Sequence, residues 1–384
     1  MLPSGSFHPN HNQFYLISNI KKSFTGLDGI GKLNSPNRQN RLVKLQDPLT
    51  CAINRLRGQA AAQSQIMVRQ LMAPDSHPKT VMIVWSPARQ SSLQEKVKCE
   101  YERSRNAVGR GQRTEPREVG EGERLESPPT PLRFLREFVS PNKPCLISNA
   151  TLHWPALSSW SHDDYLSRAL SNDVVSLHLT PNGRADALVP APSTSSSSLC
   201  FASPYVHRLL FPEALRLILS CGNANSSGTV AYAQQQNDCF RSEYSALAAD
   251  CEPHIPWASQ ALGCLPEAVN LWIGNHLSET SFHKDHYENL YAVVCGQKHF
   301  LLLPPTDVHR MYIRQYPAAH YSFSQDSGQL KLELDNPARN VPWCSVNPYP
   351  SPETKDAEIS QFPLYFNGPK PLECTVKAGE ILYL

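Results

Sequence analysis

The sequence predicts a mainly β protein with flanking helices, in which short strands form a double-sheet barrel of the jelly-roll or cupin type. Apolar residues at 268–274 predict one of these strands. Residues 287–294 and 298–303 predict two more, and Cys295-Gly296-Gln297 between them is a tight hairpin connection. Short strands separated by turns are typical of double-sheet barrels.

Length and composition predict three segments. The chain has 384 residues, 33 of them proline, and 40% are hydrophobic, which indicates a globular part joined to a poorly folding part. Residues 1–120 are predicted to be a poorly ordered extension, because only short apolar pieces, such as 14–20 and 81–85, interrupt a polar sequence rich in Asn and Arg. Residues 121–260 are predicted to form a module of helices and strands, and residues 261–384 the barrel core.

Charge and motifs argue against several classes of partner. The formal net charge is +2 at pH 7, so no overall field indicates nucleic acid or a membrane surface. Arginines between 103 and 117 would suit a basic contact segment, but glutamates are interspersed among them. Residues 26–32 have the G-x-x-x-x-G-K spacing of a phosphate-binding loop, but Leu33 stands where a hydroxyl would hold Mg²⁺. No stretch is long and apolar enough to span a bilayer, and no direct nucleic-acid motif is present.

The cysteines favour a reducing compartment. All 11 are scattered without a C-x-x-C pair, which argues against a zinc ribbon, a thioredoxin-like motif and a PHD-type reader domain. An odd number of cysteines without an export signal fits reduced thiols. The predicted location is therefore cytoplasmic, nuclear or both.

Helices and strands alternate in the middle of the chain. Thr130 is a predicted N-cap, with Pro131 at the first helical position. Further strands are predicted at 145–147, 174–179 and 229–235, and further helices at 161–170 and 204–220. Pro212 interrupts the last of these. A long irregular region is expected between residues 304 and 366.

His283 and Asp285 are the candidate metal ligands. In an extended strand their side chains point to the same face, because the side-chain period is two. An imidazole beside a carboxylate supplies two of the three ligands of a 2-His-1-carboxylate facial triad, which leaves iron positions open for a chelating keto acid and O₂. Alone the pair is a weak signal, and a solvated His and Asp on a surface strand is the ordinary alternative.

Lys298 and Thr280 strengthen this interpretation. Lys298 begins the strand that follows the hairpin, where an ammonium offers charge and donors to the far carboxylate of a dicarboxylate cosubstrate. Thr280 supplies a hydroxyl that suits the same carboxylate. A solvated hairpin lysine and a β-branched strand former are the ordinary alternatives. His286 and His299 are expected on the opposite faces of their strands, in structural roles.

Other stretches accompany this motif in a fixed order. They are TSFHKDHYENLY at 280–291, GQKHF at 296–300, Pro304-Pro305, SPPTPLRFLREFVSPNKPCLISNA at 127–150, HWPAL at 153–157, residues 174–183 and HIPWA at 254–258. Together they resemble the JmjC family of iron and 2-oxoglutarate oxygenases. The similarity is greatest to its JmjC-only subgroup, the jumonji domain-containing protein 7-like proteins, and in particular to plant members. It covers about residues 120–384 and does not extend to residues 1–120.

The resemblance implies a fold, a reaction and a ligand set. The family fold is a double-stranded β-helix with helices outside it, often a homodimer. Its members use Fe(II) and the cosubstrate 2-oxoglutarate to hydroxylate a lysine side chain of a protein, such as a histone or a GTPase-like protein, or to demethylate a histone lysine. His283 and Asp285 resemble the first two iron ligands. Lys298 and Thr280 resemble the residues that bind the 2-oxoglutarate C5 carboxylate, and Asn289 and Tyr232 resemble polar residues around the cosubstrate.

One family ligand has no counterpart in this sequence. The family's second histidine follows a segment like residues 378–384, and here Leu384 is the last residue. His309 and His320 have the wrong spacing to replace it. A truncated gene model and a genuine short isoform are both open, and the barrel is then expected to be incomplete at its C-terminal end. The expected consequences are poor iron binding and little turnover.

Two alternatives to an active oxygenase follow. The first is a catalytically weak or inactive truncated JmjC protein that acts as an interaction module. The second is a metal-free or sugar-binding cupin, which Lys298 and Thr280 argue against.

Overall fold

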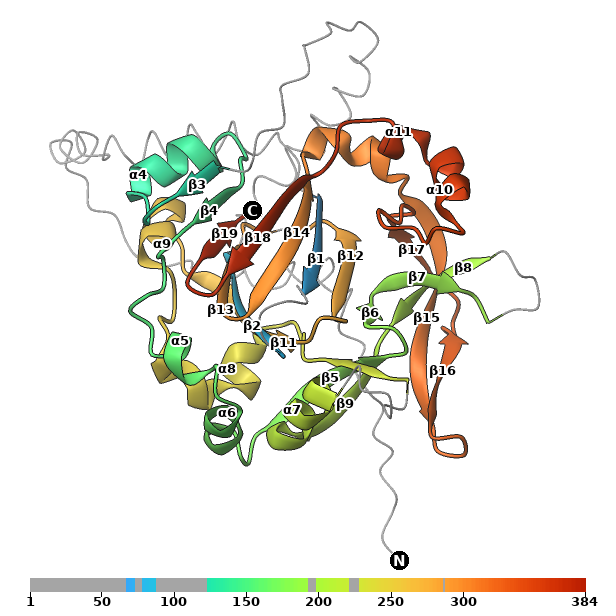
Figure 1. Cartoon of the computed structure of the whole chain (residues 1–384), viewed down its shortest axis with the longest axis horizontal. Helices are drawn as coiled ribbons and strands as arrows, with labels where there is room; N and C mark the ends of the chain where they lie inside the picture. The colour runs from blue at the N-terminus through green and yellow to red at the C-terminus, as the bar shows by residue number, and fades with distance from the viewer. Residues whose placement is uncertain (1–66, 73–77, 88–122, 193–197, 221–227, 286) are drawn as a thin grey trace, which may run out of the picture. The chain divides into compact units, whose positions relative to one another are not determined.

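Two β-sheets whose strands come from distant parts of the chain form the centre of the computed structural model (Figure 1). It describes residues 67–72, 78–87, 123–192, 198–220, 228–285 and 287–384. The first sheet has the strand order β18-β14-β1-β12-β6, and the second has the order β11-β2-β13-β19-β4-β3. These short, mostly antiparallel strands confirm the predicted mainly β barrel of the cupin type with helices outside it.

The strands of these two sheets have the following bounds: β1 (Met67–Met72), β2 (Thr80–Pro87), β3 (Glu123–Leu125), β4 (Cys145–Ile147), β6 (Arg184–Ala185), β11 (Pro266–Gly274), β12 (Glu279–His283), β13 (Leu290–Cys295), β14 (Gln297–Leu303), β18 (Leu372–Lys377) and β19 (Ile381–Tyr383). The remaining strands are β5 (Val174–Thr180), β7 (Ala187–Pro190), β8 (Leu199–Ser203), β9 (Tyr205–Leu210), β10 (Val230–Tyr232), β15 (Arg314–Ser324), β16 (Gln329–Leu334) and β17 (Asn340–Trp343).

The helices have the following bounds: α4 (Pro131–Phe134), η2 (Leu135–Val139), α5 (Ala156–Ser159), α6 (Asp163–Ala169), α7 (Phe211–Ser220), α8 (Cys239–Glu243), η3 (Ser245–Asp250), α9 (Pro256–Leu262), η4 (Pro305–Met311), α10 (Lys355–Gln361) and α11 (Pro363–Phe366). Within the described part of the chain, we find no helix with the length and apolar character needed to cross a membrane.

Strand β2 lies in the interior of the second sheet. It pairs antiparallel with β11 on one side and with β13 on the other. Val81, Ile83 and Trp85 pack into the core beneath the helices, whereas Met82 and Val84 face the core between the two sheets. A strand buried on both faces is a continuous apolar run without polar alternation, and residues 81–85 have that character.

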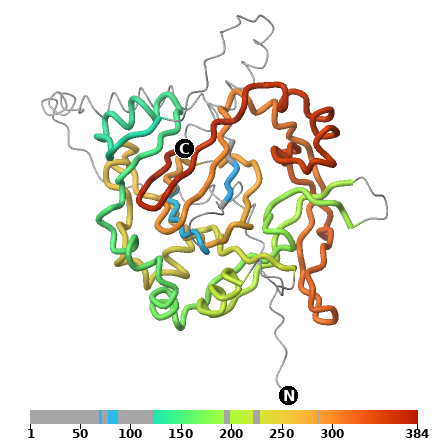
Figure 2. The backbone as a smooth tube through the Cα atoms, in the orientation of Figure 1, coloured from blue at the N-terminus to red at the C-terminus, as the bar shows by residue number. Residues whose placement is uncertain are grey.

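Strand β1 has the equivalent interior place in the first sheet, between β12 and β14. Figures 1 and 2 show both N-terminal strands, in blue, among strands from the C-terminal part of the chain. The prediction that residues 1–120 form a poorly ordered extension is therefore wrong for residues 67–72 and 78–87. Their partner strands lie about 200 residues later in the sequence, so the local sequence pattern does not predict the pairing. The other residues of that segment, including 26–32, lie outside the described residues.

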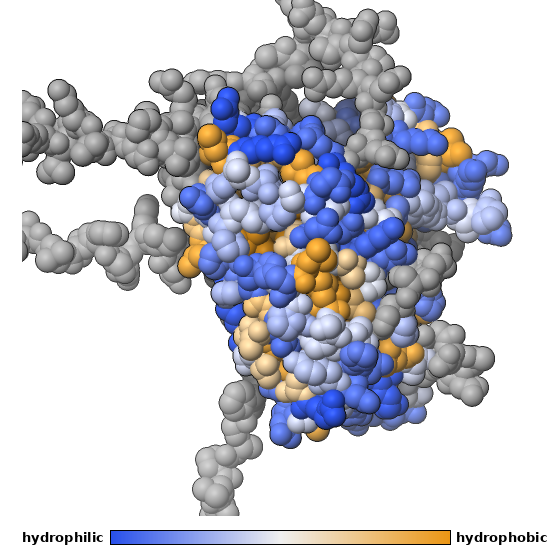
Figure 3. Space-filling view, turned by 60° about the vertical axis from the view of Figure 1, so that its left-hand side comes forward, coloured by the Kyte–Doolittle hydropathy of each residue, from blue (hydrophilic) through white to orange (hydrophobic). Residues whose placement is uncertain are grey.

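Helices between residues 131 and 262 cover the outer face of the second sheet. Phe134, Phe138, Trp160 and Leu166 pack with the outward side chains of β2 in one large apolar core. The predicted cap of α4 is confirmed, because Thr130 Oγ1 accepts a hydrogen bond of 3.3 Å from the backbone N–H of Arg133. On the face shown in Figure 3, hydrophilic residues predominate and hydrophobic ones form small separate groups.

Two predicted segments differ in the structure. Residues 205–210 form strand β9, paired along its whole length with β5, and the helix α7 begins only at Phe211. Pro212 is tolerated there because the first turn of a helix needs no intrahelical donor. The expected irregular region at 304–366 contains η4, strands β15, β16 and β17, and helices α10 and α11. Cross-strand pairing stabilises β9, β15, β16 and β17, and that pairing outweighs local periodicity.

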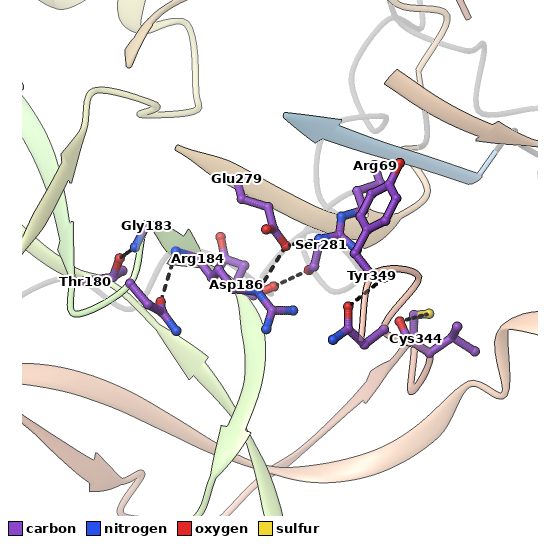
Figure 4. Close-up of polar contacts among 12 residues, drawn as sticks. Arg69, Thr180, Gly183, Arg184, Asp186, Glu279, Ser281, Cys344 and Tyr349 are labelled. Atoms are coloured by element: carbon purple, nitrogen blue, oxygen red, sulfur yellow. Dashed lines mark hydrogen bonds and ion pairs between the residues drawn. The ribbon is translucent and has the colours of Figure 1, made fainter. Parts of the chain in front are cut away.

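A buried ion cluster ties β1 to the barrel (Figure 4). Glu279 Oε1 accepts from the guanidinium of Arg69 at 2.5 Å and from that of Arg184 at 3.0 Å. Burial lowers the pKa of Arg69, and Glu279 opposes that shift. One carboxylate therefore balances two guanidinium groups that come from strands β1 and β6.

We expect Glu279→Gln to lower the free energy of unfolding by about 3 kcal/mol, because removing the shared carboxylate leaves the buried Arg69 charge uncompensated. Urea unfolding followed by circular dichroism measures the change. Glu333→Gln on β16 is the matched control, since the Glu333 side chain is 42% exposed. Equal effects of the two substitutions would contradict a stabilising role for the cluster.

Candidate functional site

His283 and Asp285 lie together at one end of β12. The strand ends at His283, so the prediction that both belong to one extended strand is wrong, and Asp285 reaches the site from the segment that follows. His283 Nε2 is 3.7 Å from Asp285 Oδ2. The backbone carbonyl of Ser281 accepts a hydrogen bond of 2.9 Å from His283 Nδ1. A proton on Nδ1 leaves Nε2 of the neutral ring free to bind a metal.

The two side chains shift each other's protonation. Burial alone would lower the pKa of His283, but Asp285, the Ser281 carbonyl and Asp186 together outweigh it and the net pKa is raised. Burial alone would raise the pKa of Asp285, but His283, Tyr291 and Asn289 together lower it. Each side chain thus favours the charged form of the other. A metal ion that binds His283 Nε2 competes with a proton for that nitrogen.

Two side chains hold the Asp285 carboxylate in place. Asn289 Nδ2 donates to Asp285 Oδ2 at 2.9 Å, and the Tyr291 hydroxyl donates to the same oxygen at 3.3 Å. Asn289 Oδ1 accepts from the hydroxyl of Ser86 on β2 at 2.8 Å. Asn289 is therefore a positioning residue for Asp285, whereas the sequence comparison placed it around the cosubstrate. Ser86 and Tyr291 have no counterpart in the sequence-based site.

Lys298 is fully buried inside the barrel and is not a solvated hairpin residue. Its Nζ donates to the Tyr232 hydroxyl at 2.7 Å and lies 5.3 Å from the ring centroids of Tyr232 and Trp272. Within the described residues it has no carboxylate partner. Burial therefore lowers the pKa of Lys298 well below its usual range. An ammonium in this setting is suited to a negatively charged ligand.

Thr280 faces the same interior because β12 is bulged. In the register with β1, Gln70 lies opposite Thr280 and Val68 lies opposite His283, with an irregularity between the two pairs. The extra residue of a bulge brings Thr280 and His283 to one face of the sheet. Thr280 Oγ1 is buried and has no hydrogen-bond partner in the described part of the chain. Burial raises the pKa of Tyr232, and the nearby Thr280 hydroxyl opposes that rise.

Comparison with known proteins agrees with this geometry. A family model described as "Cupin-like domain" matches residues 131–384. The chain belongs to the cupin-like JmjC family. This is an enzyme family, and its demethylase and lysyl hydroxylase members are 2-oxoglutarate-dependent oxygenases.

Three similar relatives are named JmjC or lysine-modifying proteins. "Lysine-specific demethylase JMJ32" of Arabidopsis thaliana is 62% identical over 68% of this chain and 74% of its own length. "Bifunctional peptidase and (3S)-lysyl hydroxylase JMJD7" of Homo sapiens is 41% identical over 68% of this chain and 76% of its own. "JmjC domain-containing protein E" of Dictyostelium discoideum is 35% identical over 68% and 75%. They confirm the resemblance to the JmjC-only proteins.

The JmjC residues fit part of an iron site. His283 Nε2 and Asp285 Oδ2 are donors of the kind that Fe(II) accepts, and the keto acid of 2-oxoglutarate adds two oxygen donors. Among the described residues, no group of three His, Cys, Asp or Glu side chains lies close enough to hold a metal. His309 and His320 are engaged with Thr306 and Asp335. His286 lies outside the described residues.

The cosubstrate fits the barrel interior more completely. The buried Lys298 amine and the Thr280 hydroxyl offer donors to a carboxylate, and the Tyr232 hydroxyl accepts from Lys298 and lies near Thr280. One further carboxylate, that of Asp186, lies near His283 and was not predicted from the sequence. Asp186, in a left-handed backbone conformation at φ 52°, is half-buried, and burial raises its pKa to about 6 while His283 opposes the shift.

Proposed function

We propose that this chain is an Fe(II)- and 2-oxoglutarate-dependent dioxygenase that hydroxylates lysine side chains of a protein. The observation that carries the proposal is the Lys298 ammonium, fully buried without a carboxylate partner in the described residues, in the same barrel as the His283–Asp285 pair. A dicarboxylate keto acid would join these two places, with one end at Lys298 and the other at the metal.

Each residue then has a stated part. His283 Nε2 and Asp285 Oδ2 would hold the iron, while Asn289 and Tyr291 keep the carboxylate oriented. Lys298 and Thr280 would bind the C5 carboxylate inside a barrel whose apolar lining excludes water. When bound, iron and 2-oxoglutarate supply an oxidant for O₂-dependent attack on a C–H bond.

The names of the relatives support lysine as the target. One relative is named a lysine-specific demethylase and another a lysyl hydroxylase. We propose the same side chain for this protein, in a histone or a GTPase-like protein of the cytoplasm or nucleus, with a homodimer as the working assembly. Hydroxylation of a side-chain carbon and of an N-methyl group differ only in the C–H bond that is attacked, so both lysyl hydroxylation and demethylation are open to the site.

We expect His283→Ala to reduce 2-oxoglutarate turnover by about 100-fold or more, because even residues that only support a metal ligand are worth about 10- to 100-fold. Succinate formation measures turnover, and mass spectrometry of the peptide distinguishes a gain of oxygen on lysine from loss of a methyl group. His299→Ala is the control, since His299 bonds Thr375 away from the pair.

Three outcomes separate the hypotheses. Turnover in the wild type that His299→Ala preserves and His283→Ala abolishes supports the dioxygenase. Turnover that survives His283→Ala contradicts the site. A wild type that binds no iron and forms no succinate contradicts the proposal and favours a catalytically inactive interaction module.

A further inference from the structure

Gln70 on strand β1 is buried inside the barrel without hydrogen bonds. Its side chain is completely buried, and neither Oε1 nor Nε2 has a partner among the described residues. Burying an amide without partners costs free energy, and native structures retain few such groups. Residue 70 also precedes the part of the chain that the family model matches, so no family motif accounts for it.

The strand register identifies the face on which Gln70 lies. Gln70 stands opposite Thr280 on β12 and opposite Phe300 on β14. Residues in register on neighbouring strands share a face of the sheet. Phe300 belongs to the core between the two sheets, together with Tyr232 and other aromatic residues. Gln70 therefore faces the barrel interior.

Lys298 and Thr280 are the polar neighbours of Gln70 on this face. Lys298 is two residues from Phe300 on β14, and side chains two apart along a strand point to the same side. Arg69, which precedes Gln70 on β1, faces the other side of the sheet and forms an ion pair with Glu279. Burial raises the pKa of Tyr291 well above its usual range, and Gln70 opposes that rise, so the Gln70 side chain lies near the Tyr291 hydroxyl although neither of its polar atoms meets the geometry of a hydrogen bond.

We propose that Gln70 is a binding residue for the distal carboxylate of the 2-oxoacid, with its Nε2–H₂ donating beside the Lys298 ammonium and the Thr280 hydroxyl. This inference rests on the proposed function and adds a binding residue from outside the family-matched region. A carboxylate accepts several hydrogen bonds at once, so one ligand group would satisfy the donors of all three side chains. It would also explain why an interior strand position holds glutamine rather than an apolar residue.

The test compares Gln70→Leu with the wild-type full chain. Leucine has a similar volume and removes the two unpaired polar atoms. We expect the melting temperature of the ligand-free protein to stay the same or rise, whereas a purely structural glutamine would lower it on replacement. We expect 2-oxoglutarate affinity, measured by calorimetry without oxygen and with or without Fe(II), to fall about 10- to 100-fold, as for a hydrogen bond to a charged group.

Two further variants keep the test decisive. Gln70→Glu preserves shape, places an acid beside the ligand carboxylate and is expected to weaken 2-oxoglutarate binding at least as much as Gln70→Leu. Gln329→Leu changes an exposed glutamine on β16 and should leave binding unchanged. The inference is overturned if both Gln70 variants bind 2-oxoglutarate like the wild type, or if Gln70→Leu lowers the ligand-free melting temperature. If the wild type itself does not bind 2-oxoglutarate, the proposed function fails first.

Discussion

A chain that lacks residues 1–87 is expected to lose its cooperative unfolding transition, because strands β1 and β2 lie in the interior of the two central sheets. Removal of β2 leaves the facing edges of β11 and β13 without backbone partners. Removal of β1 does the same to the facing edges of β12 and β14. Unpaired interior strands are open edges that aggregate.

The apolar contribution has a similar magnitude to the whole stability of a domain. Five consecutive β2 residues, from Val81 to Trp85, are at most 2% exposed. Burying one large apolar side chain contributes roughly 1.5–3 kcal/mol, so five contribute about 7–15 kcal/mol. Domains of this kind are stable by only about 5–15 kcal/mol.

Thermal unfolding followed by circular dichroism tests this expectation. The matched control lacks only residues 1–66 and retains both strands, so it should unfold cooperatively. A peptide of residues 67–87 added to the shorter chain should restore a transition. A shorter chain that melts like the control would show that β1 and β2 do not hold the barrel together.

Lys298→Met is expected to separate stability from ligand binding. The ammonium is buried beside Tyr232 and Trp272, and removing a buried charge that faces a ligand carboxylate costs about 2–5 kcal/mol of binding. We therefore expect 2-oxoglutarate affinity to fall by about 100-fold or more, measured by calorimetry. The ligand-free protein should become more stable at neutral pH, because folding no longer requires Lys298 either to bury a charge without a counterion or to give up its proton.

The pH dependence of the free energy of unfolding is a second test of Lys298. The folded pKa of Lys298 is lowered, so between that value and about 10.4 the unfolded chain binds more protons than the folded chain. The free energy of unfolding therefore rises with pH through that window, and it falls again as pH is lowered from about 10.4 to the folded pKa. The rise should be missing in Lys298→Met and present in Lys331→Met, whose side chain is 68% exposed in the wild type. Equal slopes in the two variants would contradict the lowered pKa of Lys298.

Much of the barrel and the motif was predictable from local patterns. The tight turn at Gly296 and the cap at Thr130 depend on neighbouring residues only, and the structure has both. The predicted hairpin is wrong, because β13 and β14 on either side of this turn belong to different sheets and pair with other strands. His283 and Asp285 were recognisable because their chemistry and spacing are local. Lys298 was recognisable from its place after the turn at Gly296, although its complete burial was not.

Tertiary pairing accounts for what these patterns missed. A single run of residues does not reveal that Val81–Trp85 is an interior strand, since its partners on β11 and β13 follow about 200 residues later. The same pairing brings Ser86 to Asn289 and Gln70 to Thr280. Local sequence specifies which groups can bind iron or a carboxylate. Which of them meet depends on strand register, because register is set by the burial of whole sheet faces and not by neighbouring residues.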